Sequence, residues 1–159
     1  MALKRSQITL SEAEMQAFLE EERVVTCATI GPSGRPHLMP LWYIVDRGLI
    51  TGWTFGKSQK AKNLERLPQA TLQVEAGRDQ YAELRGVMLE CDVEIVRDPA
   101  AVEAIGTALT RRYGGLPRGA ELPPEARALV ARQAPKRVGL RFHPTRVVSW
   151  DHRKLGGRY

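Results

Sequence analysis

The sequence has few of the residues from which metal sites and catalytic constellations are built. Its 159 residues include two cysteines and three histidines. Their spacing matches neither metal ligands nor a disulfide framework, so we expect no metal site. Cys27 and Cys91 lie in apolar runs and are predicted to be core residues. Motifs for a nucleophile or a P-loop are also missing, so an enzyme of this sequence would rely on a bound cofactor.

Long apolar runs are missing as well. No segment approaches the ~18 apolar residues of a membrane span. Residues 1–7 lack the apolar stretch of a signal peptide. We therefore expect one domain, residues 1–159, that is cytoplasmic and does not enter a membrane.

Acidic residues are outnumbered by basic ones. The chain has 24 Lys and Arg against 18 Asp and Glu, a formal net charge of +6. This excess favours an anionic partner, either nucleic acid, a membrane surface or a phosphorylated small molecule. The basic residues form no block of five, and no aromatic stacking platforms alternate with them. Nucleic acid is therefore the weaker interpretation.

Apolar patterning and turn signals predict a mainly β (α+β) fold with peripheral helices. Strands are expected at 24–30, 35–45, 49–55, 70–76, 81–96, 136–142 and 146–150, and helices at 12–22, 59–67, 99–113 and 124–133. Ser11 and Glu14 have the spacing of a capping box at the start of the first helix. The first three strands form an antiparallel meander, which typically begins a barrel or sandwich. Residues 98–135 are interpreted as a helical insertion that covers part of a substrate pocket.

The second predicted strand is unusually apolar. Residues 37–45 are apolar or aromatic at nearly every position, which predicts that both faces are covered. The cover could be a helix, a second subunit or a flat apolar ligand. Pro40 removes a backbone donor, so this strand should lie at an edge or bulge.

A basic segment follows the third strand. Residues 57–64 read Lys-Ser-Gln-Lys-Ala-Lys-Asn-Leu and open a predicted helix. The first turn of a helix has free N–H groups and a partial positive charge, so it can bind phosphate. The alternative is a solvated helix face.

The order of these features resembles the flavin/deazaflavin oxidoreductase superfamily, which includes pyridoxamine 5′-phosphate oxidases. The similarity covers residues 10–96 and resumes at 147–157. It implies a split β-barrel of the FMN-binding type, with six to seven antiparallel strands in a Greek-key-like order. It also implies a homodimer with cofactor sites at the interface and a small-molecule hydride acceptor.

The sequence departs from the FMN-binding branch at three points. Gln59 replaces an arginine, residues 39–43 contain no basic residue, and Gly86 replaces a glutamine near the ring. The pattern more closely resembles the branch that binds the deazaflavin coenzyme F420. The resemblance therefore implies an F420-dependent reductase. The alternatives are an FMN-binding flavoprotein of the same fold, or a non-catalytic module that binds haem, another cofactor or nucleic acid.

The resemblance also implies site residues. The ring is expected along Met39, Pro40, Leu41 and Trp42, with Trp150 as a possible wall. Trp53 and Thr54 match a pair that ends the third strand. The phosphate is expected at Lys57, Ser58, Gln59, Lys60 and Asn63, and the oligoglutamate tail at Lys62 and Arg78.

No catalytic residue is identified from the sequence. Tyr43, His152 and Arg153 are candidate proton donors, and each has a structural alternative. Tyr43 could instead be a dimer contact, His152 a surface or core residue, and Arg153 part of a C-terminal salt bridge.

Overall fold

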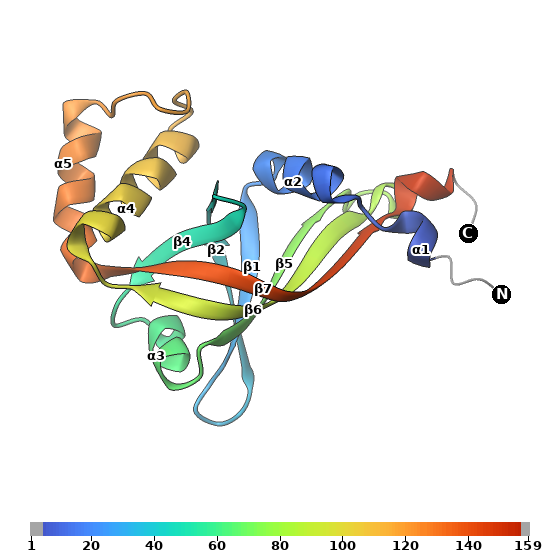
Figure 1. Ribbon diagram of the computed structural model, residues 1–159, viewed down its shortest axis with the longest axis horizontal. Coiled ribbons are helices and arrows are strands. Elements are labelled where there is room, and N and C mark those ends of the chain that lie inside the picture. Colours follow the sequence, from blue (N-terminus) through green and yellow to red (C-terminus); the bar gives the residue numbers. More distant parts are fainter. Residues whose placement is uncertain (1–4, 157–159) are drawn as a thin grey trace.

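Strands with alternating buried and exposed residues form the body of the protein, as in Val24–Ile30 and Gln69–Ala76. The computed structural model describes residues 5–156. Its strands are β1 (Val24–Ile30), β2 (Pro36–Trp42), β3 (Ile44–Asp46), β4 (Leu49–Phe55), β5 (Gln69–Ala76), β6 (Arg85–Val96) and β7 (Arg137–Asp151). They form one antiparallel sheet in the order β2-β1-β5-β6-β7-β4-β3. The sheet curls into a half-barrel (Figure 1), which confirms the expected α+β split-barrel fold.

Helices lie around this sheet (Figure 1). They are α1 (Arg5–Ile8), α2 (Glu12–Glu21), α3 (Gln59–Arg66), α4 (Pro99–Tyr113) and α5 (Pro124–Gln133), with 3-10 turns η1 (Tyr81–Glu83), η2 (Ala134–Lys136) and η3 (His152–Leu155). The expected capping box begins α2, because Ser11 and Glu14 each accept a hydrogen bond from the backbone of the other. Within residues 5–156, none of the helices has the length and apolar character needed to cross a membrane.

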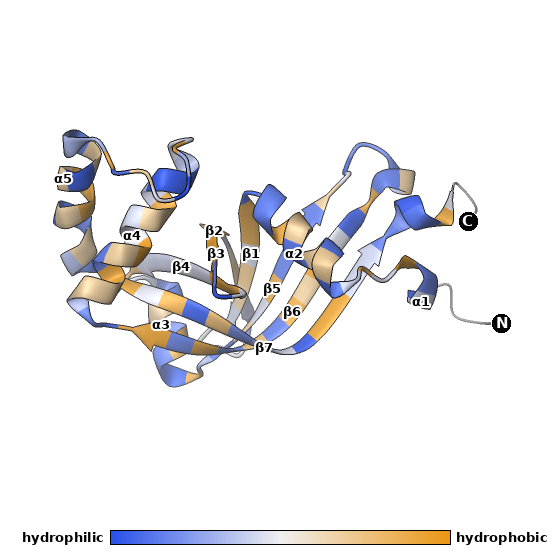
Figure 2. Ribbon diagram, turned by 45° about the horizontal axis from the view of Figure 1, so that its top comes forward, coloured by the Kyte–Doolittle hydropathy of each residue, from blue (hydrophilic) through white to orange (hydrophobic). Residues whose placement is uncertain are grey.

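The main core lies inside the curl of the sheet. It is centred on fully buried side chains such as Leu72, Leu140 and Phe142, and it includes the free thiols of Cys27 and Cys91. A second, smaller cluster lies between α4 and the ends of the long strands. Figure 2 shows apolar residues alternating along the strands and following one side of α4. The helical segment 98–135 is therefore packed on the sheet through its own apolar contacts.

Three predicted strand boundaries are wrong. Tyr43 divides the expected strand 35–45 into β2 and β3, because its N–H and C=O bond to side chains of α4. Residues 81–83 form η1 before β6 begins. The two strands expected at the C-terminus are one continuous strand, since a register shift after Glu90 in β6 accommodates Pro144 of β7.

Strand β2 lies at an edge of the sheet, as Pro40 predicts. The expectation that both of its faces are covered is not met within one chain. The side chains of Leu38, Met39 and Trp42 are 58%, 46% and 59% exposed, and only Leu41 of this strand is buried. The apolar surface of β2 is thus available to a partner or a ligand.

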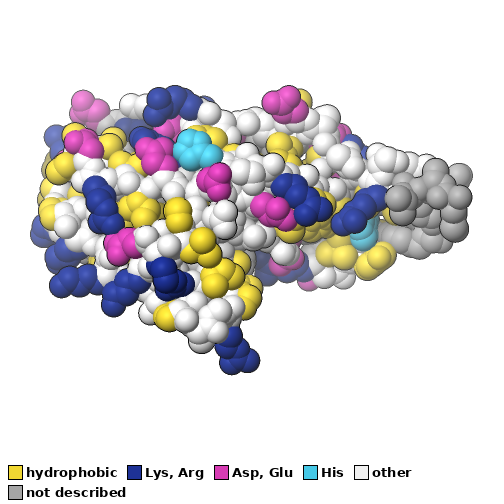
Figure 3. Space-filling model, turned by 60° about the horizontal axis from the view of Figure 1, so that its bottom comes forward, with side chains coloured by type: hydrophobic (Ala, Val, Ile, Leu, Met, Phe, Trp, Pro, Cys, Tyr) yellow, Lys and Arg dark blue, Asp and Glu magenta, His cyan; other side chains and the backbone are white. Residues whose placement is uncertain are grey.

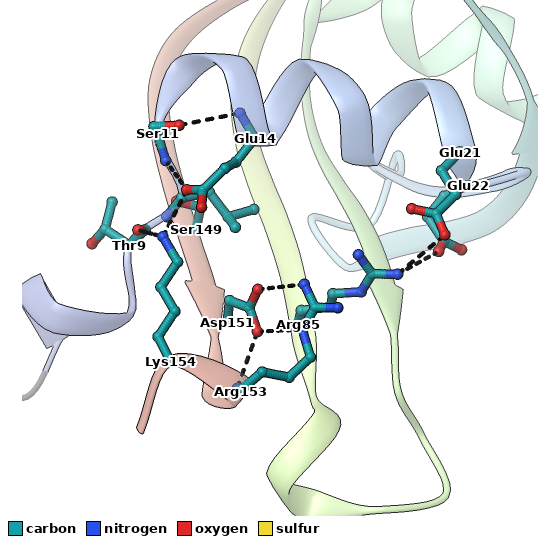
Figure 4. Close-up of polar contacts among 11 residues, drawn as sticks. Thr9, Ser11, Glu14, Glu21, Glu22, Arg85, Ser149, Asp151, Arg153 and Lys154 are labelled. Carbon is teal, nitrogen blue, oxygen red and sulfur yellow. Dashed lines mark hydrogen bonds and ion pairs between the residues drawn. The ribbon is translucent and has the colours of Figure 1, made fainter. Parts of the chain in front are cut away.

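Polar contacts join the first and last described segments (Figure 4). Lys154 Nζ donates to the carbonyl of Thr9 at 2.9 Å and to Glu14 at 2.6 Å. Nearby, Asp151 is buried and accepts two hydrogen bonds from the Arg153 guanidinium, at 2.9 and 2.6 Å. These bonds lower the pKa of Asp151. The contacts fix η3 against the N-terminal segment.

Candidate functional site

A cavity of about 560 Å³ lies between one end of the sheet and helices α4 and α5. Its sheet side contains six residues that the sequence resemblance implied, namely Pro40, Leu41, Trp42, Trp53, Thr54 and Lys60. The opposite side is formed by the helical segment and the start of β7, with Leu109, Thr110, Leu129, Val130, Gln133 and Arg137. The helical segment 98–135 therefore forms one side of the cavity.

Two indole rings form flat apolar walls of this cavity. Trp42 is stacked on Tyr113 of α4, with ring centroids 4.3 Å apart and planes 4° apart. Trp53 lies directly against the α4 backbone at Gly106, where an added Cβ would be only 2.3 Å from the indole Cζ3. Helix α4 therefore positions both rings, and the cavity suits a planar aromatic ligand.

Lys60 is the buried cation of the site. It lies in the first turn of α3 and is only 6% exposed. Among residues 5–156, no hydrogen-bond acceptor or carboxylate pairs with its ammonium group, although it lines the cavity. Desolvation lowers the pKa of Lys60, with a smaller opposing effect from Cys27. A largely buried lysine whose ammonium faces the cavity without a counter-charge favours an anionic ligand at this point.

Hydroxyl groups hold the start of α3 against the end of β4. The Ser58 side chain accepts a hydrogen bond from the Ala61 N–H at 3.2 Å and lies 3.3 Å from Thr54 Oγ1. Ser58 therefore caps the helix, while Thr54 also borders the cavity. The helix start, its cap and Lys60 form one polar end of the site.

Two other residues predicted at the phosphate position have internal partners. Asn63 is fully buried and donates to Thr29 Oγ1 at 3.0 Å. Its amide oxygen accepts a hydrogen bond from Gln59 Nε2 at 2.8 Å. Asn63 therefore anchors α3 to β1, and Gln59 holds the Asn63 amide. Lys57 is exposed and lines a neighbouring groove.

The remaining predicted residues do not line the cavity in one copy of the chain. Met39 and Lys62 are exposed. Arg78, in the turn after β5, pairs with Glu75 at 3.5 Å. Trp150 of β7 covers Gly86 of β6, where an added Cβ would be 2.4 Å from the indole. The close packing of Trp150 explains why residue 86 is a glycine. The register shift of β6 lies elsewhere, after Glu90.

The three candidate proton donors also lie outside the cavity. Tyr43 is fully buried, and its hydroxyl donates to the Leu19 carbonyl at 2.7 Å. Burial raises the pKa of Tyr43. His152 Nδ1 contacts the Tyr81 carbonyl at 3.1 Å, and Arg153 is bound to Asp151. The side chains of Tyr43, His152 and Arg153 thus make contacts within the protein, and none of them reaches the cavity.

The sequence interpretation missed Gln133 and Arg137. The Arg137 guanidinium lies over the rings of Trp53 and Phe55, 4.6 and 4.1 Å from their centroids. Its Nε atom and the Gln133 Oε1 atom are buried without hydrogen-bond partners. Burial lowers the pKa of Arg137. The sequence signal that could have identified Arg137 was the basic pair of Lys136 and Arg137 at the start of a predicted strand. No acidic residue between 134 and 141 is available to pair with it.

The cavity lining contains no carboxylate, imidazole or thiol. Residues 5–156 also hold no group of three or more His, Cys, Asp or Glu side chains placed to bind a metal ion. What the lining offers is aromatic surface, hydroxyl and amide groups and two cations. It can therefore bind a planar, anionic molecule and orient it, and it suits a cofactor that brings its own chemistry.

Solved structures show the same fold. A conserved hypothetical protein, Rv2991 from Mycobacterium tuberculosis, is 42% identical over 99% of this chain and 95% of its own, with a TM-score of 0.88. A structure described as an F420 reductase is 24% identical over 87% of this chain and 98% of its own, with a TM-score of 0.61. The heme storage protein HutZ from Vibrio cholerae is 18% identical over 87% and 94%, with a TM-score of 0.67.

A comparison with functionally curated proteins gave no match. A family model, by contrast, covers most of the chain. The model described as pyridoxamine 5′-phosphate oxidase matches residues 11–151, from the start of α2 to the end of β7. That range includes every residue that lines the cavity. The chain therefore belongs to the pyridoxamine 5′-phosphate oxidase family.

Proposed function

We propose that this protein is an oxidoreductase that uses coenzyme F420 to transfer a hydride to or from a small organic acceptor. The observation that carries the proposal is the buried, unpaired ammonium of Lys60 at one end of a cavity with two indole walls. A deazaflavin with a phosphate-bearing side chain has the complementary shape and charge. Family membership supports a flavin-type cofactor, and the neighbour described as an F420 reductase supports the deazaflavin.

The residues of the chain fit such a cofactor. Lys60 would bind the phosphate, with the Ser58 and Thr54 hydroxyls beside it. Trp42 and Trp53 would contact the ring and exclude water from it. When bound, the deazaflavin supplies the carbon that gives or accepts the hydride. The protein contributes binding, orientation and a dry environment.

FMN remains the alternative cofactor, since the family and a neighbour described as an FAD-binding protein both support flavins. The polar end of the cavity argues for F420. Gln59 stands where the FMN-binding branch has an arginine, and its amide is directed to Asn63. Strand β2 adds no cation. A haem is less suitable, because the cavity lining has no His, Cys, Met or Tyr ligand for iron.

The proposal is tested by titrating the protein with F420 and FMN side by side. Wild type should quench deazaflavin fluorescence and bind FMN more weakly. Lys60→Met keeps the apolar stem and removes the charge, so F420 affinity should fall by about 1.5–3 kcal/mol, or roughly 10- to 150-fold. Lys62→Met, on the exposed side of the same helix, should bind as wild type. Preference for FMN would contradict the proposal, and an unchanged Lys60→Met would remove Lys60 from the site.

The lowered pKa of Lys60 gives the same site a pH signature. The ammonium is charged below that pKa and neutral above it, so anion affinity should be complete at lower pH. It should decline as the pH rises through the pKa, earlier than for an ordinary lysine. Fluorescence titrations across pH should show this decline in wild type. In Lys60→Met the decline should disappear, and its persistence would assign the titration to another group.

We also propose that a second copy of the chain covers β2 in a homodimer. The exposed apolar side chains of Leu38, Met39 and Trp42 support this, because Trp42 belongs both to the cavity and to the uncovered strand. Met39→Glu should shift the protein to monomers in sedimentation experiments and weaken cofactor binding. Leu67→Glu, at a 37% exposed residue after α3, is the matched control and should stay dimeric. A dimeric Met39→Glu would place the interface elsewhere.

A further inference from the structure

Arg137 joins two cavities. One is the aromatic cavity described above, and the other is a groove of about 780 Å³ that is also lined by Lys57, Arg97 and Lys136. Lys and Arg side chains gather toward the left of the face in Figure 3, the end that carries α5 and the start of β7 in Figure 1. A ligand in the aromatic cavity could therefore extend past Arg137 into a strongly basic groove.

Arg137 differs from its neighbours in having no anionic partner. Arg141, on the same strand, bonds to Glu94 at 3.1 Å, and Arg97 in the groove pairs with Glu65 at 2.6 Å. Among residues 5–156, no carboxylate lies within ion-pair distance of Arg137. The Nε atoms of both Arg137 and Arg141 are buried without an acceptor, so the missing carboxylate is what sets Arg137 apart. The guanidinium also lies over the rings of Trp53 and Phe55, 4.6 and 4.1 Å from their centroids. These rings restrain the guanidinium, and within residues 5–156 none of its nitrogens donates to an acceptor.

Gln133 provides a second unsatisfied polar group in the same cavity. It ends α5, one short turn before Arg137, and its buried Oε1 lacks a donor. Buried polar groups normally have partners, so an unsatisfied amide beside the unsatisfied Nε of Arg137 points to a ligand at this wall. The amide can supply either a donor or an acceptor to that ligand. A carboxylate only accepts hydrogen bonds, so it would be met by the Nε2 of Gln133, with the amide turned over from its present orientation.

We propose that Arg137 and Gln133 form a carboxylate-binding subsite at the junction of the aromatic cavity and the basic groove. The subsite rests on the proposed function, since it extends the same cofactor site. A planar guanidinium binds a carboxylate through two parallel hydrogen bonds, which a lysine cannot reproduce. The carboxylate can come from the oligoglutamate tail of the cofactor, continuing toward Lys57 and Lys136, or from a planar acid that accepts the hydride. Lys62 and Arg78 line neither space.

Two cofactor-free probes distinguish these sources. One is a γ-linked triglutamate peptide, and the other is 2-naphthoate, each compared with its methyl ester. Binding is measured from tryptophan fluorescence and from the Trp53 indole N–H signal, because Arg137 lies on that ring. Wild type should bind at least one acid about tenfold or more tightly than its ester. Preference for the peptide identifies the tail as the source, and preference for naphthoate identifies the acceptor.

The variants decide whether Arg137 is responsible. Arg137→Gln should abolish the preference for acid over ester, and Arg137→Lys should restore it only in part. Arg141→Gln removes the same charge from the same strand outside both cavities and should behave as wild type. Gln133→Leu should weaken acid binding several-fold and remains informative if thermal unfolding shows that Arg137→Gln is not folded.

The inference is overturned if wild type does not distinguish either acid from its ester, or if Arg137→Gln retains the preference. An F420 titration on the same samples separates this result from the proposed function. Acid binding through Arg137 without F420 binding would refute only the F420 assignment. F420 binding with no effect of Arg137 on any probe would refute only the subsite.

Discussion

Replacing Arg112 by methionine should destabilise the protein by about 3 kcal/mol, the largest stability effect that we expect. This side chain connects α4 to the sheet and to the end of α2. Its guanidinium donates to the backbone carbonyls of Tyr43, Leu19, Glu20 and Glu22. Hydrogen bonds from a charged donor contribute about 1.5–3 kcal/mol each, and their loss leaves carbonyls unsatisfied, although water will replace some of them.

The measurement is denaturant unfolding, supported by a fall in Tm of roughly 6–12 °C. Arg111→Met is the matched control, because Arg111 makes a single contact to the Ala120 carbonyl at 2.6 Å. Its cost should be much smaller. Arg112→Lys should fall between the two, since a lysine cannot reach several carbonyls at once. Equal stability of the Arg111 and Arg112 variants would show that the carbonyl network contributes little.

Replacing Gly106 by valine should have the largest effect on cofactor binding after loss of the Lys60 charge. The glycine lies in the middle of α4, where an alanine would favour the helix by about 0.5–1 kcal/mol. Steric conflict outweighs that gain, because a Cβ would lie 2.3–2.9 Å from three atoms of the Trp53 ring. Either the indole moves into the cavity or α4 moves away from the sheet. We expect a cost of about 1–3 kcal/mol in stability and at least tenfold in F420 affinity.

Ala104→Val places the same side chain on the exposed side of α4 and should alter neither quantity appreciably. A compensating change provides a stricter test. Trp53→Leu combined with Gly106→Val should recover stability, because the smaller side chain makes room for the valine, but it should not recover affinity. Full affinity in the Gly106→Val single variant would show that Trp53 is not a wall of the cofactor site.

Local signals were sufficient for much of the fold. The capping box at Ser11 and Glu14 located α2, and Pro40 identified an edge strand, since both act through neighbouring backbone groups. The start of α3 was also predicted, and the structure shows that Ser58 caps it. Lys60 could be proposed because it lies in the first turn of that helix, where free N–H groups and a partial positive charge favour a phosphate.

Long-range contacts were not accessible in this way. Tyr43 interrupts a strand-like run only because Arg112 and Tyr113, about 70 positions later, take its backbone hydrogen bonds. Asn63 was expected at a ligand, but its amide is used by Thr29 of β1. Arg137 was overlooked because what marks it as a binding residue is the lack of a carboxylate partner. That lack can be recognised only when the surrounding side chains have been placed in the structure.

Arg112 contacts its neighbours through their main chain, and this determines which positions are free to vary. A carbonyl is present whatever the side chain, so residues at the end of α2 can change without loosening the attachment of the helical segment. Arg112 itself cannot be replaced without loss of these hydrogen bonds. Of the cavity-facing leucines, Leu109 of α4 is buried in the cluster that packs the helical segment on the sheet, whereas Leu129 of α5 is 47% exposed. Leu129 is therefore the more suitable site for altering the acceptor preference of the proposed oxidoreductase by directed evolution, since neither that cluster nor the Arg112 network depends on its identity.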